Sequence, residues 1–310
     1  MSRRYIFSVG IISTGDYGMR WSNDRAGALS VLVILVASLA VSGCINDTKS
    51  GAGAGESVEN VELQIAGSTT VLPIAEECAR VFMEKHPGSR IDVAGGGSSH
   101  GIKAVAEGTV DIGTASRELK ESERSRYPDL IPHPIAKDGV AIVVHPSNPV
   151  NSITMEELRR IYTGEITNWK DLGGVDARIM VVSREEGSGT RDCFEHAVMK
   201  PINEEITDTA IIQDSNGKVR ATVAGNENAI GFLSLGYVNQ DVKALKLDGV
   251  EPTVENVVNG KYPISRTLWM ITKGDPDPGE EEFLDFILSE EGQEIVEELH
   301  FIPVGGRGSR

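Results

Sequence analysis

The sequence predicts an α/β protein, because short apolar runs alternate along it with amphipathic stretches of helix length. The chain has 310 residues. The residues before position 61 have the composition of a leader and a linker, so the folded part has about 250 residues, which is enough for one large or two small α/β lobes. No internal repeat interrupts the alternation.

The apolar runs that we expect to form strands are short and rich in Val and Ile. Two of them, VAIVVH and TLWMIT, are apolar along almost their whole length, as buried strands are. The predicted strands are Val61–Ala66, Arg90–Val93, Val110–Thr114, Val140–His145, Ile179–Ser183, Ile230–Phe232 and Thr267–Thr272.

Amphipathic stretches between these runs predict helices. The first has Pro73 in its first turn, where a missing backbone N–H costs little. The last is long and acidic and is expected to break or bend around Gly292. The predicted helices are Pro73–His86, Ile102–Glu107, Met155–Tyr162, Arg191–Met199, Lys218–Ala224 and Glu280–His300.

The N-terminal segment has the pattern of an export signal. An apolar run, Ala28–Val41, has the length of a signal-peptide core and is too short for a membrane span. The residues Ser42-Gly43-Cys44 that follow it resemble a lipobox. We therefore expect residues 1–43 to be a cleaved signal peptide and Cys44 to carry a lipid anchor. The alternative is a chance cysteine behind a buried helix.

Two further features flank this signal. Met19 stands just before two arginines and the apolar run, so a start at Met19 gives a more usual signal peptide than a start at Met1. Residues 44–60 are rich in Gly, Ser, Asn and charge and poor in apolar side chains. Such a composition predicts a flexible tether between the anchor and the folded part.

The charge and the cysteines exclude several kinds of function. The formal net charge is −16, which argues against nucleic acid as a partner, since a phosphate backbone requires a basic surface. Cys78 and Cys193 lack the spacing of a metal site, and we expect no cofactor. Cys78 falls on the apolar side of a predicted helix and is expected in the core. A disulfide between Cys78 and Cys193 is the less favoured alternative.

Three segments rich in Gly, Ser and Thr each lie where a predicted strand meets a predicted helix. They are residues 67–70 (GSTT), 95–101 (GGGSSHG) and 184–190 (REEGSGT). Helix N-termini offer unpaired N–H groups to anions, glycine permits close approach, and hydroxyls add donors. One such segment alone is explained by helix capping. Three of them together indicate a shared oxyanion site.

Arg184 opens the third of these segments. Its guanidinium can donate two parallel hydrogen bonds to a tetrahedral oxyanion, and Glu186 is a candidate to hold it in place. The alternative is a surface Arg–Glu pair of little energetic value. A further polar turn, residues 214–217 (DSNG), is expected to cap a helix, with lining of the same site as the alternative.

Four strings carry a resemblance to a known family. They are AGSTTVLPIAEE, GGGSSHGIKAVAEGTVDIGTASREL, SREEGSGTRDCFE and GNENAIGFLSLGYV, in this order over nearly all of residues 61–310. Together they resemble the phosphate-binding subunit of ABC phosphate transporters. The resemblance implies a type II periplasmic-binding-protein fold, with two α/β lobes, a two-strand hinge and the ligand in the cleft. Lobe 1 would be residues 61–138 plus 266–310, and lobe 2 residues 139–265.

The resemblance also implies the ligand-binding residues and the partners. The partners would be inorganic phosphate and the permease subunits of an ABC importer, with the protein a monomer anchored at the outer face of the cell membrane. The implied ligand-binding residues are Ser68, Thr69, Thr70, Ser98, Ser99, Ser116, Arg117, Arg184, Ser188, Gly189 and Thr190.

One position departs from the family pattern. Many members carry an Asp after the DxGxxS strand, whose carboxylate accepts the proton of hydrogen phosphate and repels fully ionised sulfate. This chain has Arg117 there, after Ser116. Arg117 can add a second cationic clamp, with Asp138, Asp214 or Glu186 as a replacement acceptor. The ligand is thus expected to be phosphate, with sulfate, arsenate, molybdate or tungstate as alternatives.

An enzyme and a ligand-sensing module are the two alternatives to a transport protein. As an enzyme, a serine hydrolase would use Ser188 or Ser98, but the third loop lacks a G-x-S-x-G elbow and no histidine is clearly placed as a base. A metal-dependent phosphatase would need clustered Asp and His ligands, and the sequence has no such cluster. A ligand-sensing module would share the fold without transport. We therefore expect a binding protein and no enzyme.

Overall fold

The computed structural model describes residues 60–305, which belong to one structural unit. The predicted signal peptide of residues 1–43, the predicted lipid site at Cys44 and the predicted tether up to residue 59 lie outside the described residues. Within residues 60–305, no helix is both long enough and apolar enough to cross a lipid bilayer.

A mixed β-sheet forms the centre of the described residues. Its strands are β1 (Glu62–Gly67), β2 (Arg90–Gly95), β3 (Ile112–Ala115), β4 (Leu130–Val144), β6 (Met180–Arg184), β7 (Ile211–Gln213), β8 (Ala229–Ser234), β9 (Lys243–Ala244) and β11 (Ser265–Lys273). Their order in the sheet is β2-β1-β3-β11-β4-β8-β6-β7, and β9 pairs with β4. A separate two-stranded sheet joins β5 (Ser152–Ile153) and β10 (Lys246–Leu247).

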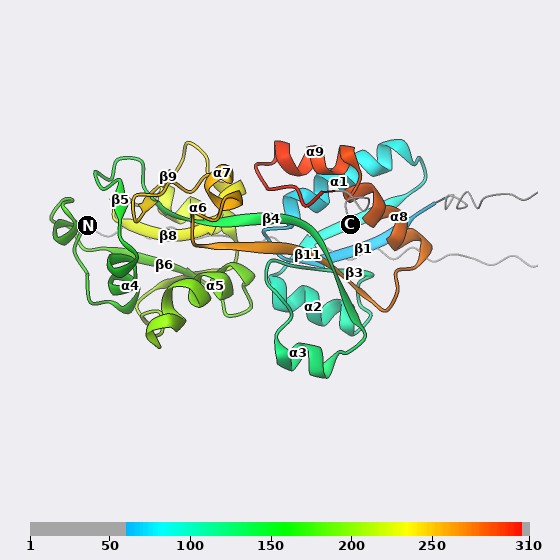
Figure 1. The fold of residues 1–310 in the computed structure, drawn as a ribbon, viewed down its shortest axis with the longest axis horizontal. Helices are drawn as coiled ribbons and strands as arrows, with labels where there is room; N and C mark the ends of the chain where they lie inside the picture. Colours follow the sequence, from blue (N-terminus) through cyan, green and yellow to red (C-terminus); the bar gives the residue numbers. More distant parts are fainter. Residues whose placement is uncertain (1–59, 306–310) are drawn as a thin grey trace, which may run out of the picture. The chain divides into compact units, whose positions relative to one another are not determined.

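The sheet has two halves that share the long strand β4. In the first half, β1 runs parallel to β2 and β3, and β11 runs antiparallel to β3. In the second half, β6 runs parallel to β7 and β8, and β8 runs antiparallel to β4. Residues 130–139 of β4 pair with β11, whereas residues 140–144 pair with β8. Strands β4 and β11 therefore run from one half to the other (Figure 1).

Helices connect the strands and cover both faces of the sheet, as parallel strands require. The α-helices are α1 (Leu72–Lys85), α2 (Ser98–Ala106), α3 (Glu121–Arg126), α4 (Met155–Thr163), α5 (Gly189–Phe194), α6 (Asn216–Ala224), α7 (Val254–Val258), α8 (Pro278–Ile287) and α9 (Glu290–Glu298). Short π- and 3₁₀-turns continue α5 as far as Ile202.

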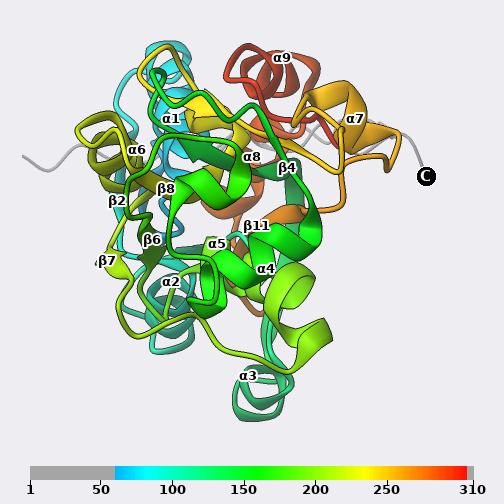
Figure 2. The same ribbon diagram turned by 90° about the vertical axis from the view of Figure 1, so that its left-hand side faces the viewer.

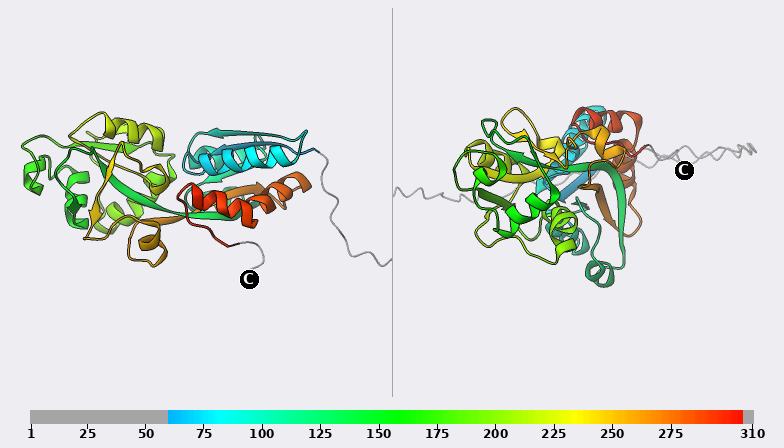
Figure 3. Two further views of the ribbon diagram at one scale, coloured as in Figure 1. Left: turned by 90° about the horizontal axis from the view of Figure 1, so that it is seen from above. Right: turned by 60° about the vertical axis from the view of Figure 1, so that its left-hand side comes forward.

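Each half has apolar cores of its own. On the first half, α1, α8 and α9 cover one face and α2 covers the other (Figure 1 and Figure 3), and Phe82 and Phe283 are fully buried on the α1 face. On the second half, α4 and α5 cover one face and α6 the other (Figure 2), with Trp169 and Phe232 buried on the α4 face. Burial of these apolar side chains from water is the main stabilising contribution to each half.

Two predicted elements differ in detail from the structure. The break predicted in the helix Glu280–His300 is confirmed, but it comes at Leu288, a few residues before Gly292, because Ser289 accepts a hydrogen bond from the Gly292 N–H and so caps α9. The strand predicted at Val140–His145 is the end of the longer β4, whose first part contains two prolines that weaken the strand signal.

The prediction that Cys78 is a core residue is confirmed, since Cys78 is fully buried on the inner face of α1. Cys78 and Cys193 are both free thiols in the structure, so the alternative of a disulfide between them is not realised. Burial raises the pKa of the Cys78 thiol to about 12 and that of Cys193 to about 11.

Candidate anion-binding site

Five buried hydroxyl side chains gather where the two halves of the sheet meet. We call Thr69, Thr70, Ser98, Ser116 and Thr190 the hydroxyl cluster, and none of them is more than 8% exposed. Two pairs are in direct contact, with Thr70 Oγ1 lying 3.3 Å from Thr190 Oγ1 and Ser98 Oγ lying 3.4 Å from Ser116 Oγ. Thr190 follows β6 and the other four follow strands of the first half, so the cluster joins both halves.

The first loop brings Thr69 and Thr70 to the cluster. Gly67 ends β1 with φ of 140°, and a Cβ there would lie 2.2 Å from the Thr114 carbonyl oxygen, so only glycine fits. Ser68 Oγ accepts hydrogen bonds from the N–H groups of Thr70, at 3.1 Å, and Val71, at 3.4 Å. These contacts stabilise the turn into α1 and leave the two threonine hydroxyls free to face the second half.

The second loop brings Ser98 to the cluster and turns Ser99 elsewhere. Ser98 begins α2, and its Oγ accepts a hydrogen bond of 3.0 Å from the Ser116 N–H, which ties α2 to the end of β3. Ser99 donates its N–H to the Gly187 carbonyl at 3.1 Å, a contact between the two halves. Its hydroxyl accepts a hydrogen bond from Arg117.

The third loop supplies Thr190 and a close contact between the halves. Ser188 is buried and caps α5 by accepting a hydrogen bond of 3.2 Å from the Arg191 N–H. Gly189 packs so tightly against the first half that an added Cβ would lie 2.4 Å from Ser98 Oγ and 2.5 Å from Ser116 Oγ. Glycine at this position therefore lets the third loop approach the second loop.

Arg184, at the end of β6, is the buried cation of the site. Glu185 takes one edge of the guanidinium with hydrogen bonds of 2.9 and 3.0 Å, and Nη2 also lies 3.4 Å from Thr69 Oγ1. Arg184 is 1% exposed, and its Nη1 has no hydrogen-bond partner. Burial lowers the pKa of Arg184, although Glu185 opposes that shift. A buried guanidinium nitrogen without an acceptor is costly, so Nη1 indicates a place for a ligand oxygen.

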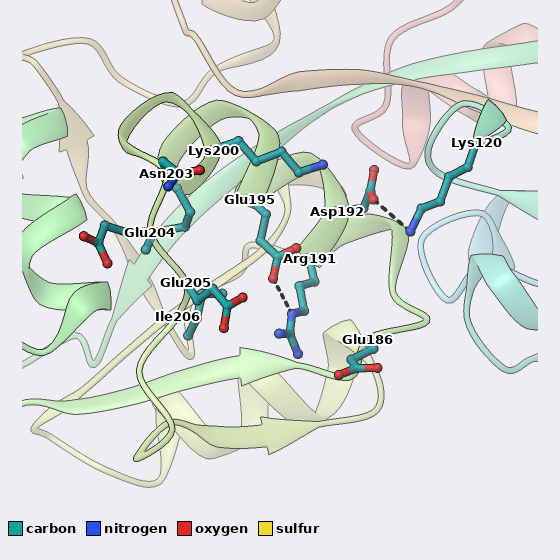
Figure 4. Close-up of a pocket in the computed structure, with 11 residues that line it drawn as sticks. Lys120, Glu186, Arg191, Asp192, Glu195, Lys200, Asn203, Glu204, Glu205 and Ile206 are labelled. Atoms are coloured by element: carbon teal, nitrogen blue, oxygen red, sulfur yellow. Dashed lines mark hydrogen bonds and ion pairs between the residues drawn. The ribbon is translucent and has the colours of Figure 1, made fainter. Parts of the chain in front are cut away.

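The carboxylate that holds Arg184 is Glu185, and the prediction of Glu186 in this role was wrong. Glu186 instead lines a polar groove of about 730 Å³ beside α5. Figure 4 shows the side chains that line this groove, Arg191 among them. That groove carries more carboxylates than cationic groups, because Asp192, Glu195, Glu204 and Glu205 also line it. An anion is therefore favoured at the hydroxyl cluster and disfavoured in the groove.

Asn216, the first residue of α6, is a site residue that the sequence indicated only as an alternative. It is fully buried, and its Nδ2 donates hydrogen bonds to Thr69 Oγ1 at 3.2 Å and Thr70 Oγ1 at 2.9 Å. Its Oδ1 accepts from the Thr190 hydroxyl at 3.5 Å. The capping role predicted for the turn belongs to Ser215, whose hydroxyl accepts from the Lys218 N–H. Asn216 thus crosslinks three members of the hydroxyl cluster.

Arg266, at the start of β11, was not among the predicted ligand residues. Its side chain is 4% exposed and pairs with Asp138, which is fully buried. Two of its nitrogens also reach the hydroxyl cluster, with Nη1 3.3 Å from Ser116 Oγ and Nη2 3.0 Å from Thr70 Oγ1. No local sequence pattern marks this contact, because Arg266 precedes the predicted strand Thr267–Thr272 and is far along the chain from its partners Thr70 and Ser116.

Arg117 lies beside the site, but its donors point elsewhere. Both terminal nitrogens donate to the Glu123 carboxylate at 2.7 Å, and Nη1 also donates to the Glu118 carbonyl. Its one contact with a predicted ligand residue is to Ser99 Oγ, at 2.9 Å. Its neighbour Ser116, in contrast, belongs to the hydroxyl cluster. The second guanidinium in contact with the cluster is therefore that of Arg266.

A buried, polar, cation-containing site between two half-sheets is typical of the class of proteins that bind small molecules. The comparisons agree with this class. A family model described as a PBP superfamily domain matches residues 47–291. The phosphate-binding protein PstS of Bacillus subtilis is 36% identical over 278 residues, which cover 89% of this chain and 92% of that protein.

Solved structures give the same result. A putative phosphate ABC transporter substrate-binding protein with bound phosphate from Clostridium perfringens is 46% identical, with a TM-score of 0.75, covering 78% of this chain and 99% of that one. An ABC-type phosphate transport receptor from Vibrio cholerae is 36% identical, with a TM-score of 0.64, covering 77% of this chain and 99% of that one. The chain belongs to the PstS-like phosphate-binding family of the periplasmic-binding-protein superfamily, and the predicted type II fold is confirmed.

Proposed function

We propose that this protein captures inorganic phosphate outside the cytoplasm and delivers it to an ABC importer. The observation that carries the proposal is Arg184 Nη1, a buried donor without a partner beside five buried hydroxyls. Relatives that are 46% and 36% identical have names that state phosphate as the ligand or cargo. A tetrahedral dianion would give the guanidinium the acceptor that it lacks.

The chemistry of the site suits a tetrahedral oxyanion with several negatively charged oxygens. Arg184 would hold one oxygen through Nη1 and supply the positive charge, while the hydroxyl cluster would surround the others with short-range donors. No catalytic step is needed, since binding consists of exchanging water for these donors. The ligand-binding residues of the proposal are Ser68, Thr69, Thr70, Ser98, Ser116, Arg184, Ser188, Gly189, Thr190 and Asn216.

We propose that the two halves act as lobes that close over the ligand. Lobe 1 would be residues 61–138 plus 266–310 and lobe 2 residues 139–265, with the hinge in β4 and β11. Contacts beside the site support closure, because Tyr237 donates a hydrogen bond of 2.6 Å to the Thr69 carbonyl and Lys120 pairs with Asp192 at 3.3 Å (Figure 4). Each contact joins the two proposed lobes and would break when they open.

We also propose that the protein acts as a lipid-anchored monomer at the outer face of the cell membrane. The support is the order of the N-terminal sequence, in which Cys44 follows an apolar run and precedes a polar tether. Metabolic labelling with a radioactive fatty acid should mark the protein and leave the Cys44→Ser variant unlabelled. A Cys44→Ser variant that is labelled equally would overturn the anchor. Sedimentation of the purified protein should give the mass of one chain.

Isothermal titration calorimetry with inorganic phosphate tests the proposed ligand. We expect one site per chain with a dissociation constant of about 1 μM or tighter, because several charge-assisted hydrogen bonds form in a buried site. Millimolar or absent phosphate binding would contradict the proposal. Parallel titrations with sulfate, molybdate and tungstate would then identify another oxyanion as the ligand if one of them binds more tightly than phosphate.

A further inference from the structure

Arg266 and Asp138 lie opposite each other on the neighbouring strands β11 and β4. Arg266 of β11 and Asp138 of β4 are direct partners in the antiparallel register. One residue beyond Gly139, β4 stops pairing with β11 and begins to pair with β8, where Val140 lies opposite Ser234. The pair therefore lies at the junction of the two halves.

The guanidinium of Arg266 divides its donors between Asp138 and the hydroxyl cluster. Nε and Nη2 donate to Asp138 Oδ2 at 3.0 and 2.7 Å. Nη1 and Nη2 donate to Ser116 Oγ and Thr70 Oγ1 at 3.3 and 3.0 Å. Arg184 has the same arrangement, with a carboxylate on one edge and a threonine of the cluster on the other. The two guanidiniums approach adjacent residues, Thr69 and Thr70.

A ring of hydrogen bonds fixes the direction in which Arg266 points. Asp138 Oδ1 accepts from Ser234 Oγ at 3.0 Å, and the Ser234 N–H donates to Asn216 Oδ1 at 3.1 Å. Asn216 donates to Thr70 Oγ1, which accepts from Arg266. The ring closes through five residues that are nearly all buried, so it holds Arg266 in one rotamer when the two halves are in contact.

We propose that Arg266 is a second anion-binding residue, positioned by Asp138, and that the ligand lies between its guanidinium and that of Arg184. This inference rests on the proposed capture of phosphate and deepens it. Two guanidiniums at adjacent threonines repel each other, and the charge of Arg266 contributes to lowering the pKa of Arg184. An anion between them offsets that repulsion and gives Arg184 Nη1 the acceptor that it lacks.

The same geometry sets the class of anion. In residues 60–305, no hydrogen bond joins a carboxylate to the hydroxyl cluster, because Asp138 and Glu185 lie on the far edges of the two guanidiniums. A carboxylate facing the ligand would select the protonated oxygen of hydrogen phosphate and repel sulfate. Without one, the site takes tetrahedral dianions as a class, sulfate as well as phosphate.

Calorimetric titration with inorganic phosphate, at a mildly alkaline pH where phosphate is the dianion, tests the role of Arg266. We expect Arg266→Gln to weaken phosphate binding about 30-fold, since a pair of charge-assisted hydrogen bonds is lost. Asp138→Asn should stay within about tenfold, because its amide oxygen still accepts from Arg266. The double variant Asp138→Asn/Arg266→Gln should bind as weakly as Arg266→Gln and folds without an unpaired buried charge. Arg266→Gln or the double variant binding within about threefold of the wild type would overturn the proposal.

Titration with sulfate tests the class of anion and separates the two proposals. The wild type should bind sulfate no more than about 100-fold more weakly than phosphate, and Arg266→Gln should lower both affinities by the same factor. A preference for phosphate above about 10,000-fold would show a proton-reading acceptor and contradict the inference. Absent phosphate binding by the wild type would refute the proposed function alone, and the sulfate series would still decide the role of Arg266. Arg266→Lys should restore part of the loss for both anions, which a purely structural role would not produce.

Discussion

Two arginine–carboxylate pairs differ in where the remaining donors of the arginine point: Arg117–Glu123 lies between β3 and α3, and Arg266–Asp138 lies at the junction of the two halves. Arg117 gives its terminal nitrogens to Glu123, a main-chain carbonyl and Ser99. Arg266 gives one edge to Asp138 and the other to the hydroxyl cluster. The first pair ties the start of α3 to the end of β3, whereas the second joins the strands between the halves to the anion site.

The pKa values of the two carboxyl groups are shifted in opposite directions. Burial alone would raise the pKa of Glu123, but hydrogen bonds from Arg117 and the Lys120 N–H lower it below its usual value. Burial raises the pKa of Asp138, against the opposing effects of Arg266 and Ser234. A carboxyl group whose pKa is lowered in the fold stabilises the fold at neutral pH, and one whose pKa is raised by burial does not. The Arg117–Glu123 pair therefore contributes to stability at neutral pH through its charge.

The largest expected effect comes from Arg184, the other cation of the hydroxyl cluster. We expect Arg184→Gln to weaken phosphate binding more than 100-fold, or about 3 kcal/mol, because the buried charge and its free donor are both lost. The matched control is Arg117→Gln, which removes an equally buried guanidinium outside the cluster and should stay within about threefold. Calorimetry measures the phosphate affinity of both variants, and thermal unfolding checks that they fold. Equal losses of affinity in Arg184→Gln and Arg117→Gln would show that Arg184 has no special role in binding.

The second prediction concerns the close approach of the third loop to Ser116, the serine that accepts from Arg266. A Cβ on Gly189 would lie 2.4 and 2.5 Å from the Oγ atoms of Ser98 and Ser116. Gly189→Ala should weaken phosphate binding about 30-fold by holding the two halves apart, with a smaller effect on unfolding. Gly217→Ala, where an added Cβ meets nothing within 4 Å, is the control. Equal phosphate affinities in the two alanine variants would show that closure does not require this contact.

The smallest effect is a pH-dependent one at Glu123. Because the pKa of Glu123 is lowered in the fold, its stabilising contribution is fully present above the unfolded pKa and is lost as the pH falls through the folded pKa. Glu123→Gln should lower the unfolding free energy by about 1–2 kcal/mol at neutral pH, and the difference should vanish once the pH is below the folded pKa of Glu123. Urea unfolding of both proteins from neutral to acidic pH measures the difference. A difference that persists at low pH would mean that Glu123 acts by packing rather than by charge.

Much of the fold and of the site was predictable from local patterns. The strand-to-helix loops that supply Thr69, Thr70, Ser98 and Thr190 are visible because glycine and hydroxyl residues interrupt an apolar alternation. The family resemblance predicted the fold class, which the comparisons confirm. Arg184 was predicted to lie at the site because it opens the third of these loops, residues 184–190.

The residues that sequence reasoning missed are those whose role depends on pairing across the sheet. Arg266 reaches the cluster only because the register of β11 against β4 places it opposite Asp138, and a bulge at Leu268 and Trp269 shifts that register farther along. The alternation of residues along a strand predicts the sheet face on which a side chain lies, but not the residue of the neighbouring strand that it pairs with. No local pattern therefore marks Arg266. The prediction that Glu186 holds Arg184 failed for a similar reason, since a turn has no periodicity from which to assign side-chain direction.

A crystal structure of the protein with inorganic phosphate would locate the bound anion. We expect one phosphate at the hydroxyl cluster, with an oxygen within hydrogen-bond distance of Arg184 Nη1 and another within hydrogen-bond distance of Arg266. Phosphate bound in the groove lined by Glu186 and Arg191, or a crystal grown in phosphate whose hydroxyl cluster holds only water, would contradict this expectation.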